Sequence, residues 1–301
     1  MDQVKAAAAE KRPLWRRIVD YPLVAMFIAL AIVILCFSAG LLIAQYLLPP
    51  IPGFTREMRF DLVSIPIVIL AYELAIRHLG ESPRDDYRDP LWFRRLLIGV
   101  VAGLGVFSVG VAIAAALGIY RVIGPGDLSG LVPALIGPAL FAAVSEELVF
   151  RGILFRWIEE FGGSWFALLV TSAMFGAAHL HNPNASPIAA IGIAFEAGLM
   201  LGAAYMLTRS LWLPMGIHAA WNFAQGEIYD IPVSGTKVHG MVDAQLTGPP
   251  LLTGNGFGLE ASLITIMVAT VFGLWLLWLA IREGEILQPH WVRERRERAP
   301  A

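Results

Sequence analysis

The chain has 301 residues, of which 57% are hydrophobic and only 15% are charged, and its formal net charge is −2. Soluble proteins carry about 25% charged residues, so this composition excludes an ordinary soluble domain and predicts a surface that meets lipid. It also excludes a disordered, fibrous or nucleic-acid-binding protein. The single cysteine, Cys36, excludes an intramolecular disulfide and a cysteine-based metal cluster.

A membrane helix needs about 20 largely apolar residues, and the chain contains eight such stretches, separated by short breaks rich in Pro, Gly or charge. The predicted helices are Tyr21–Leu48, Leu62–Arg77, Arg95–Tyr120, Leu131–Trp157, Ser164–Leu180, Pro187–Thr208, Leu211–Gly226 and Ala261–Arg282. The second, fifth and seventh are short, so we expect them to pack inside the bundle or to cross incompletely. The sequence therefore predicts an all-α, polytopic membrane bundle of about eight transmembrane helices.

Lysine and arginine are concentrated on one side of this predicted bundle. The N-terminal segment 1–20, the loop between the second and third spans and the tail 283–301 hold most of them, and short cytoplasmic loops normally carry this excess. We therefore expect both termini in the cytoplasm and a bundle spanning residues 21–282 without a separate soluble domain. The segment Glu227–Glu260 is predicted to be a loop folded over the opposite face. The protein would be a multi-pass integral membrane protein, in the plasma membrane if bacterial.

Three ionisable residues lie close together in the fourth predicted span. Glu146, Glu147 and Arg151 interrupt an otherwise apolar helix, where each charged group costs roughly 2.5–3.5 kcal/mol at the membrane centre. Arg151 follows Glu147 by four positions, so these two can form an ion pair along one face. The pair is a sufficient structural explanation for both residues, but it leaves Glu146 without a partner.

The fifth and seventh predicted spans carry histidines. His179 follows Phe175 by four residues near the end of its span, a place where a histidine is usually interfacial. His218 and Asn222, four residues apart, share a helical face. A hydrogen bond between their side chains would be a purely structural explanation for both residues. A rise of about 1.5 Å per residue puts Glu146, both histidines and the asparagine at a similar depth, roughly 14–22 Å from the predicted cytoplasmic ends. Such a group suits water activation and oxyanion stabilisation or a metal site.

These segments form the motifs EExxxR, FxxxH and HxxxN, which begin at Glu146, Phe175 and His218. With these motifs in this order, the chain resembles the CPBP family of intramembrane proteases, the CaaX-protease and bacteriocin-processing group also called the Abi family. The resemblance covers about residues 131–226, which would be the catalytic core. It implies an eight-helix endopeptidase similar to the type II CaaX prenyl endopeptidase, acting on a membrane-associated or lipidated protein or peptide.

The resemblance also implies roles for the motif residues. Glu146 would activate the hydrolytic water with help from His179, and His218 with Asn222 would stabilise the oxyanion. The predicted ion pair on the fourth span would orient the site. If a metal such as zinc is present, its ligands would be His179, His218 and Glu146. We expect a metal-free mechanism instead, because Asn222 beside His218 is more typical of an oxyanion partner than of a ligand set.

Two other functions are compatible with buried polar residues. A proton-coupled transporter also needs them, but the sequence shows no duplicated half and no paired broken helices. A non-catalytic membrane binding or immunity protein would not need the full polar set, whose presence favours an enzyme. Glu73 in the second span and Glu196 in the sixth are expected to hydrogen-bond between helices or to face a water-filled cavity.

Overall fold

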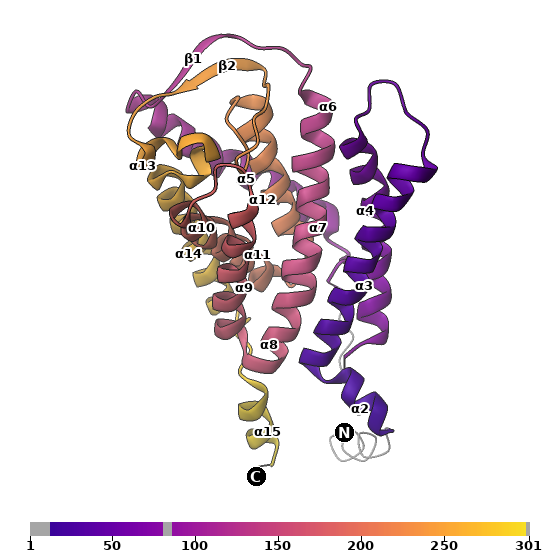
Figure 1. The fold of residues 1–301 in the computed structure, drawn as a ribbon. Coiled ribbons are helices and arrows are strands. Elements are labelled where there is room, and N and C mark those ends of the chain that lie inside the picture. The colour runs from indigo at the N-terminus through magenta and orange to yellow at the C-terminus, as the bar shows by residue number, and fades with distance from the viewer. Residues whose placement is uncertain (1–12, 81–85, 299–301) are drawn as a thin grey trace.

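The computed structural model describes residues 13–80 and 86–298 and is mostly helical within them (Figure 1). The first helical elements are α2 (Leu14–Asp20), α3 (Pro22–Leu42) with η1 (Ile43–Leu47), α4 (Arg56–His78) and α5 (Trp92–Ala116). Two continuous runs follow, with α9 (Ser164–Ala178) and η4 (His179–His181) between them: the first consists of α6 (Leu131–Ala134), η2 (Leu135–Ala142), α7 (Ala143–Glu147), η3 (Leu148–Phe155) and α8 (Arg156–Gly162), and the second of α10 (Pro187–Ile193), η5 (Ala194–Gly198) and α11 (Leu199–Thr208). The last elements are α12 (Trp212–Phe223) with η6 (Ala224–Ile228), α13 (Pro250–Thr253), η7 (Asn255–Phe257), η8 (Leu259–Ala261), α14 (Leu263–Arg282) and α15 (His290–Arg298). Each predicted span therefore forms a helix.

Within residues 13–80 and 86–298, five helical runs are long and apolar enough to cross a membrane, which supports an integral membrane protein. They are Pro22–Leu47, Trp92–Ala116, Leu131–Gly162, Pro187–Thr208 and Leu263–Arg282. The other three predicted spans correspond to α4, which contains charged residues, and to α9 and α12, which have only 15 and 12 residues. Eight crossings therefore stay a prediction.

The sidedness of the bundle also stays a prediction. Residues 1–12 of the predicted N-terminal segment and residues 299–301 of the predicted tail lie outside the described part of the chain. Helices α2 and α15, near the two ends of the described chain, lie at the same end of the bundle (Figure 1). This arrangement agrees with an even number of crossings but does not say which side of the membrane they occupy.

A small β-sheet departs from the all-α prediction. Strand β1 (Tyr120–Pro125) follows α5 and pairs antiparallel with β2 (Val242–Leu246), which lies inside the segment predicted to be a loop. A register shift between Val122 and Gly124 marks a bulge in the first strand. Figure 1 shows the sheet at the end of the bundle opposite α2 and α15. The pairing therefore fixes part of the long segment over that end.

Glycines allow α5 and α12 to pack with their backbones in contact. A Cβ added to Gly99 would clash with the carbonyl oxygen of Leu213, and one added to Gly103 would clash with that of Ile217. On the other side, a Cβ at Gly216 would meet the backbone of α5. Small residues bring membrane helices together in this way. The close contact fixes α12, the helix that carries two of the predicted site residues.

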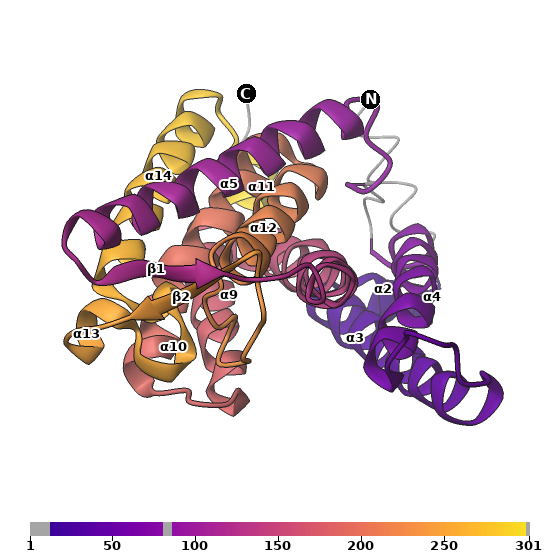
Figure 2. The ribbon, with the colours of Figure 1, turned by 90° about the horizontal axis from the view of Figure 1, so that it is seen from above.

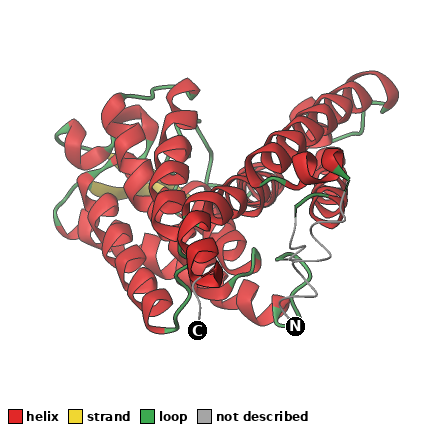
Figure 3. Ribbon diagram, turned by 90° about the horizontal axis from the view of Figure 1, so that it is seen from below, coloured by secondary structure: helices red, strands yellow, loops and turns green. Residues whose placement is uncertain are grey.

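Helices α3 and α4 form an antiparallel pair that extends away from the rest of the bundle (Figures 2 and 3). The long run Leu131–Gly162 lies between this pair and the helices that follow it in the chain. The run contains two π-helical segments, η2 and η3, and π-helical turns are frequent at functional sites. The middle of the run, around α7, is thus covered on both sides by other helices.

Candidate active site

Glu147 lies at the centre of a buried ion-pair network. Its side chain is fully buried, and its Oε1 accepts a hydrogen bond from Nη1 of Arg151 at 2.9 Å. The same oxygen lies 2.9 Å from Nδ1 of His218 on α12. The ion pair predicted from the four-residue spacing is therefore present, and it extends to a histidine 71 residues further along the chain.

Arg151 donates to main-chain oxygens as well as to the carboxylate, although its buried Nε has no partner among the described residues. Its Nη2 donates to the carbonyls of Ala197 and Gly198 at 3.1 and 3.2 Å. Both residues belong to η5, a π-helical turn whose i→i+5 bonding leaves carbonyls available to other donors. The guanidinium carbon also lies 4.7 Å from the ring centroid of Phe175, a cation–π contact. These contacts explain how a buried arginine is tolerated and why an aromatic residue precedes His179 by one turn.

The two site histidines are both oriented through Nδ1. Nδ1 of His179, the first residue of η4, lies 2.8 Å from the carbonyl oxygen of Phe175, and Nδ1 of His218 faces the carboxylate of Glu147. A carbonyl and a carboxylate can only accept, so Nδ1 donates in both residues. In the neutral imidazoles, Nε2 is then unprotonated and can accept a hydrogen bond from water.

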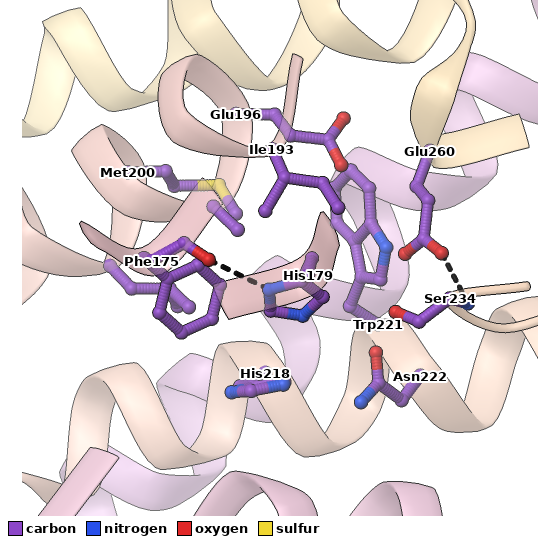
Figure 4. Close-up of a pocket in the computed structure, with 12 residues that line it drawn as sticks. Phe175, His179, Ile193, Glu196, Met200, His218, Trp221, Asn222, Ser234 and Glu260 are labelled. Carbon is purple, nitrogen blue, oxygen red and sulfur yellow. Dashed lines mark hydrogen bonds between the residues drawn. The ribbon is translucent and has the colours of Figure 1, made fainter. Parts of the chain in front are cut away.

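His179, His218 and Asn222 line one cavity together (Figure 4). The volume open to water is about 30 Å³, and one water molecule needs about 10–15 Å³ on this measure. The cavity therefore has room for about two water molecules. His218 and Asn222 are buried, with 8% and 7% exposure, whereas His179 is half-buried.

Glu146 is expected from the sequence to line this cavity, but it is not among the residues that do. Adjacent residues of a helix point about 100° apart, and it is Glu147 whose side chain reaches His218. Glu146 is half-buried, and its Oε2 is shielded from solvent without a hydrogen-bond partner among the described residues. It still lies near enough to His218 to interact with it electrostatically.

Asn222 bonds to the π-helical segment η2 rather than to His218. Its Nδ2 donates to the carbonyl oxygen of Pro138 at 2.8 Å. Figure 4 shows its amide oxygen on the side of Ser234. Pro138 uses one of the two amide hydrogens, so the other remains available to a further acceptor. The structural explanation offered by the sequence, a bond between His218 and Asn222, does not apply.

Two further carboxylates, Glu196 on η5 and Glu260 on η8, line the same cavity together with Trp221 and Ser234. The sequence singled out Glu196 because it interrupts an apolar span. Glu260 gave no signal, because a glutamate in a polar loop is ordinary. Only the long-range fold brings that loop to the cavity.

The predicted metal ligands do not converge. In the part of the chain that the structure describes, no three His, Cys, Asp or Glu side chains form a group that could hold a metal ion. His179 and His218 share the cavity, but the carboxylate expected to complete the set, Glu146, does not. The residues present therefore do not fit a zinc site as they are arranged.

Comparison with known proteins points to the same segment. Residues 128–224 match the family model described as type II CAAX prenyl endopeptidase Rce1-like. The resemblance to the CPBP family is confirmed over this segment. The chain is also 29% identical over 117 residues to the putative membrane peptidase YdiL of Bacillus subtilis (strain 168). That alignment covers 39% of this chain and 43% of the relative, so the chain matches less than half the length of this relative. The family match includes every motif residue but ends before Ser234 and Glu260.

Proposed function

We propose that this chain is an intramembrane endopeptidase that uses an activated water molecule to hydrolyse a peptide bond of a membrane-associated or lipidated protein. The observation that carries the proposal is the pair of imidazoles, His179 and His218, that share one cavity with room for water. The family match and the relative described as a putative membrane peptidase support a peptidase. A non-catalytic binding protein has no need for two histidines with oriented rings.

In the proposed reaction, Nε2 of His179 and Nε2 of His218 hold the water in the cavity. The water oxygen bonds to the substrate carbonyl carbon, and its proton passes to Glu146, whose carboxylate turns towards the cavity. The unpartnered Oε2 of Glu146 is free to make this movement. The proton then passes to the leaving amine as the peptide bond breaks.

The oxyanion formed in this step needs hydrogen-bond donors. Asn222 supplies the amide hydrogen that Pro138 does not use. His218, as an imidazolium paired with the carboxylate of Glu147, carries its proton on Nε2 throughout the reaction and is the second donor. Arg151 holds the Glu147 side chain in place through the hydrogen bond from its Nη1. No step uses a metal ion, because the candidate ligands do not form a site.

The test is to reconstitute the full chain in liposomes with membrane proteins and to compare the peptide fragments by mass spectrometry. We expect fragments with the wild type that are absent with His218→Ala. Thermal unfolding of the variant in detergent checks that it remains folded. If the wild type and the variant give the same fragments, the chain is not an endopeptidase that uses this cavity. If membrane proteins bind to the wild type and stay intact, the result would indicate that the chain is a binding protein.

A further inference from the structure

The cavity has an acidic wall, formed by two glutamates, on the side away from His218 and Asn222. Figure 4 shows His218 and Asn222 on one side of the close-up, and Glu196 and Glu260 on the other. The two glutamates are 2% and 4% exposed, so both carboxylates are almost completely removed from solvent. They come from different elements, η5 and η8, so the fold places two acidic groups in a cavity of about 30 Å³.

No lysine or arginine balances this wall among the described residues; His218 is the positive charge that acts on Glu260, and it is already paired with Glu147. Oε2 of Glu196 is buried, and no residue in the described part of the chain hydrogen-bonds to it. Glu260 accepts a hydrogen bond from the backbone N–H of Ser234, and the structure shows no ion pair for either carboxylate with a described Lys or Arg. Ionising a buried carboxyl group without a counter-charge is costly, and ionising two that face one cavity costs more. A positively charged ligand would lower this cost.

The cavity also limits the size of that ligand. Room for about two water molecules admits a methylene with a primary ammonium but not a bulky cation. The ring of Trp221 lines the same cavity, and its Nε1 is already bonded to Gln225 at 3.1 Å. An aromatic ring whose polar edge is satisfied can contribute a cation–π contact.

We propose that Glu196 and Glu260 form a subsite for a primary ammonium group of the substrate, supplied by a lysine side chain or by a free N-terminus. The substrate identity rests on the proposed endopeptidase function, whereas the ammonium site itself does not. The subsite selects peptides that carry this charge close to the bond that is hydrolysed. It disfavours a free carboxylate at the same place.

The site is tested first without catalysis, with methylammonium as the probe. The thermal unfolding temperature of the detergent-solubilised full chain is followed as methylammonium chloride replaces sodium chloride at constant ionic strength. We expect a saturable rise in the wild type and half-saturation about tenfold weaker or worse in Glu196→Gln, because a charge-assisted hydrogen bond is lost. Glu260→Gln, which keeps an oxygen for Ser234, should behave alike. Tetramethylammonium, which is too large, should give no rise.

The matched control is Glu227→Gln. Glu227 is also fully buried with unpartnered carboxylate oxygens, but it does not line this cavity. Its variant should bind methylammonium as the wild type does. A wild type that shows no saturable rise, or equal binding in all three variants, would overturn the proposal whether or not the chain hydrolyses peptides.

A second experiment distinguishes the two sources of the ammonium and separates this proposal from the proposed function. Fluorogenic peptide mixtures in bicelles carry lysine, norleucine or glutamate at one position, each with a free or an acetylated N-terminus. If the wild type prefers lysine, and Glu196→Gln abolishes this preference by raising KM without lowering kcat, the subsite binds the lysine side chain. Preference for the free N-terminus assigns it to the chain end. Cleavage without either preference overturns the subsite alone, and absence of cleavage with methylammonium binding overturns the endopeptidase alone.

Discussion

Nδ1 of His218 lies 2.9 Å from Oε1 of Glu147, and the same carboxylate oxygen accepts a hydrogen bond from Arg151. One buried oxygen therefore connects the arginine of the first motif with the histidine of the third. This contact selects the ring nitrogen of His218 that faces the cavity, which the sequence motifs alone do not specify.

Glu147→Gln should destabilise the protein as well as inactivate it. The substitution leaves the buried Arg151 without its counter-charge, and breaking a buried pair costs about 3–5 kcal/mol. We expect a clearly lower unfolding temperature in detergent and loss of hydrolysis. Glu283→Gln, at an exposed position after α14, is the control and should unfold like the wild type. An unchanged unfolding temperature in Glu147→Gln would show that the pair does not stabilise the fold.

Glu146→Gln should abolish hydrolysis without lowering the unfolding temperature. The amide has nearly the volume of the carboxylate but cannot accept the proton of the water, and general bases contribute about 10²–10⁴-fold to rates. Steady-state rates with a fluorogenic peptide measure the effect. If Glu146→Gln keeps wild-type rates while His179→Ala does not, the proton passes to His179, whose Nε2 already lines the cavity.

Removal of metal ions should leave activity unchanged. Because His179, His218 and Glu146 do not form a group that could hold an ion, we expect a strong chelator to have no effect and the purified active protein to contain substoichiometric zinc. Elemental analysis and rates before and after chelation check this. Inactivation by chelator that zinc reverses would show that the side chains rearrange around a metal.

Gly103→Ala should separate α5 from α12 and disturb the site from a distance. The added methyl group meets the carbonyl of Ile217, one residue before His218, and overpacking costs about 1–3 kcal/mol. We expect a lower unfolding temperature and reduced hydrolysis. Gly105→Ala on the same helix is the matched control, because a Cβ there meets no atom within 4 Å. Equal behaviour of the two variants would contradict the importance of the backbone contact.

The eight apolar stretches could be predicted from the sequence because lipid sets the length of an apolar run. Helical spacing also sufficed for the Glu147–Arg151 pair, which lies within one helix. It could not decide which of the two adjacent glutamates contacts His218, because the rise along a helix gives depth but not rotation, and π-helical turns change the rotation. The position of Glu260 at the cavity depends on how the loop before α14 packs against other helices, and no local sequence pattern encodes such a contact.

Burial raises the pKa of Glu260 to about 7, although hydrogen bonds from Ser234 and the charge of His218 act in the opposite direction. Between pH 4.5 and about 7, the folded protein therefore keeps a proton on Glu260, whereas the unfolded chain has released it at the ordinary pKa of 4.5. Stability should fall as the pH rises from about 4.5 to 7 and then level off. Because Glu196 and His218 face the same cavity and can also gain or lose protons, the contribution of Glu260 is measured as the difference between the wild type and Glu260→Gln. Unfolding temperatures from pH 5 to 8 should decline less in the variant, and equal slopes would contradict the prediction.

The π-helical turn η5 makes the number of residues in its helix a part of the site. Deleting one residue from Ala194–Gly198 would restore i→i+4 bonding and rotate α11 by about 100° relative to α10. The carbonyls of Ala197 and Gly198 would then turn away from Arg151. Deleting a single residue would therefore remove both main-chain contacts of Arg151, whereas replacing one side chain in this turn would leave the carbonyls in place. Homologues without the extra residue would have to neutralise their buried arginine by other means.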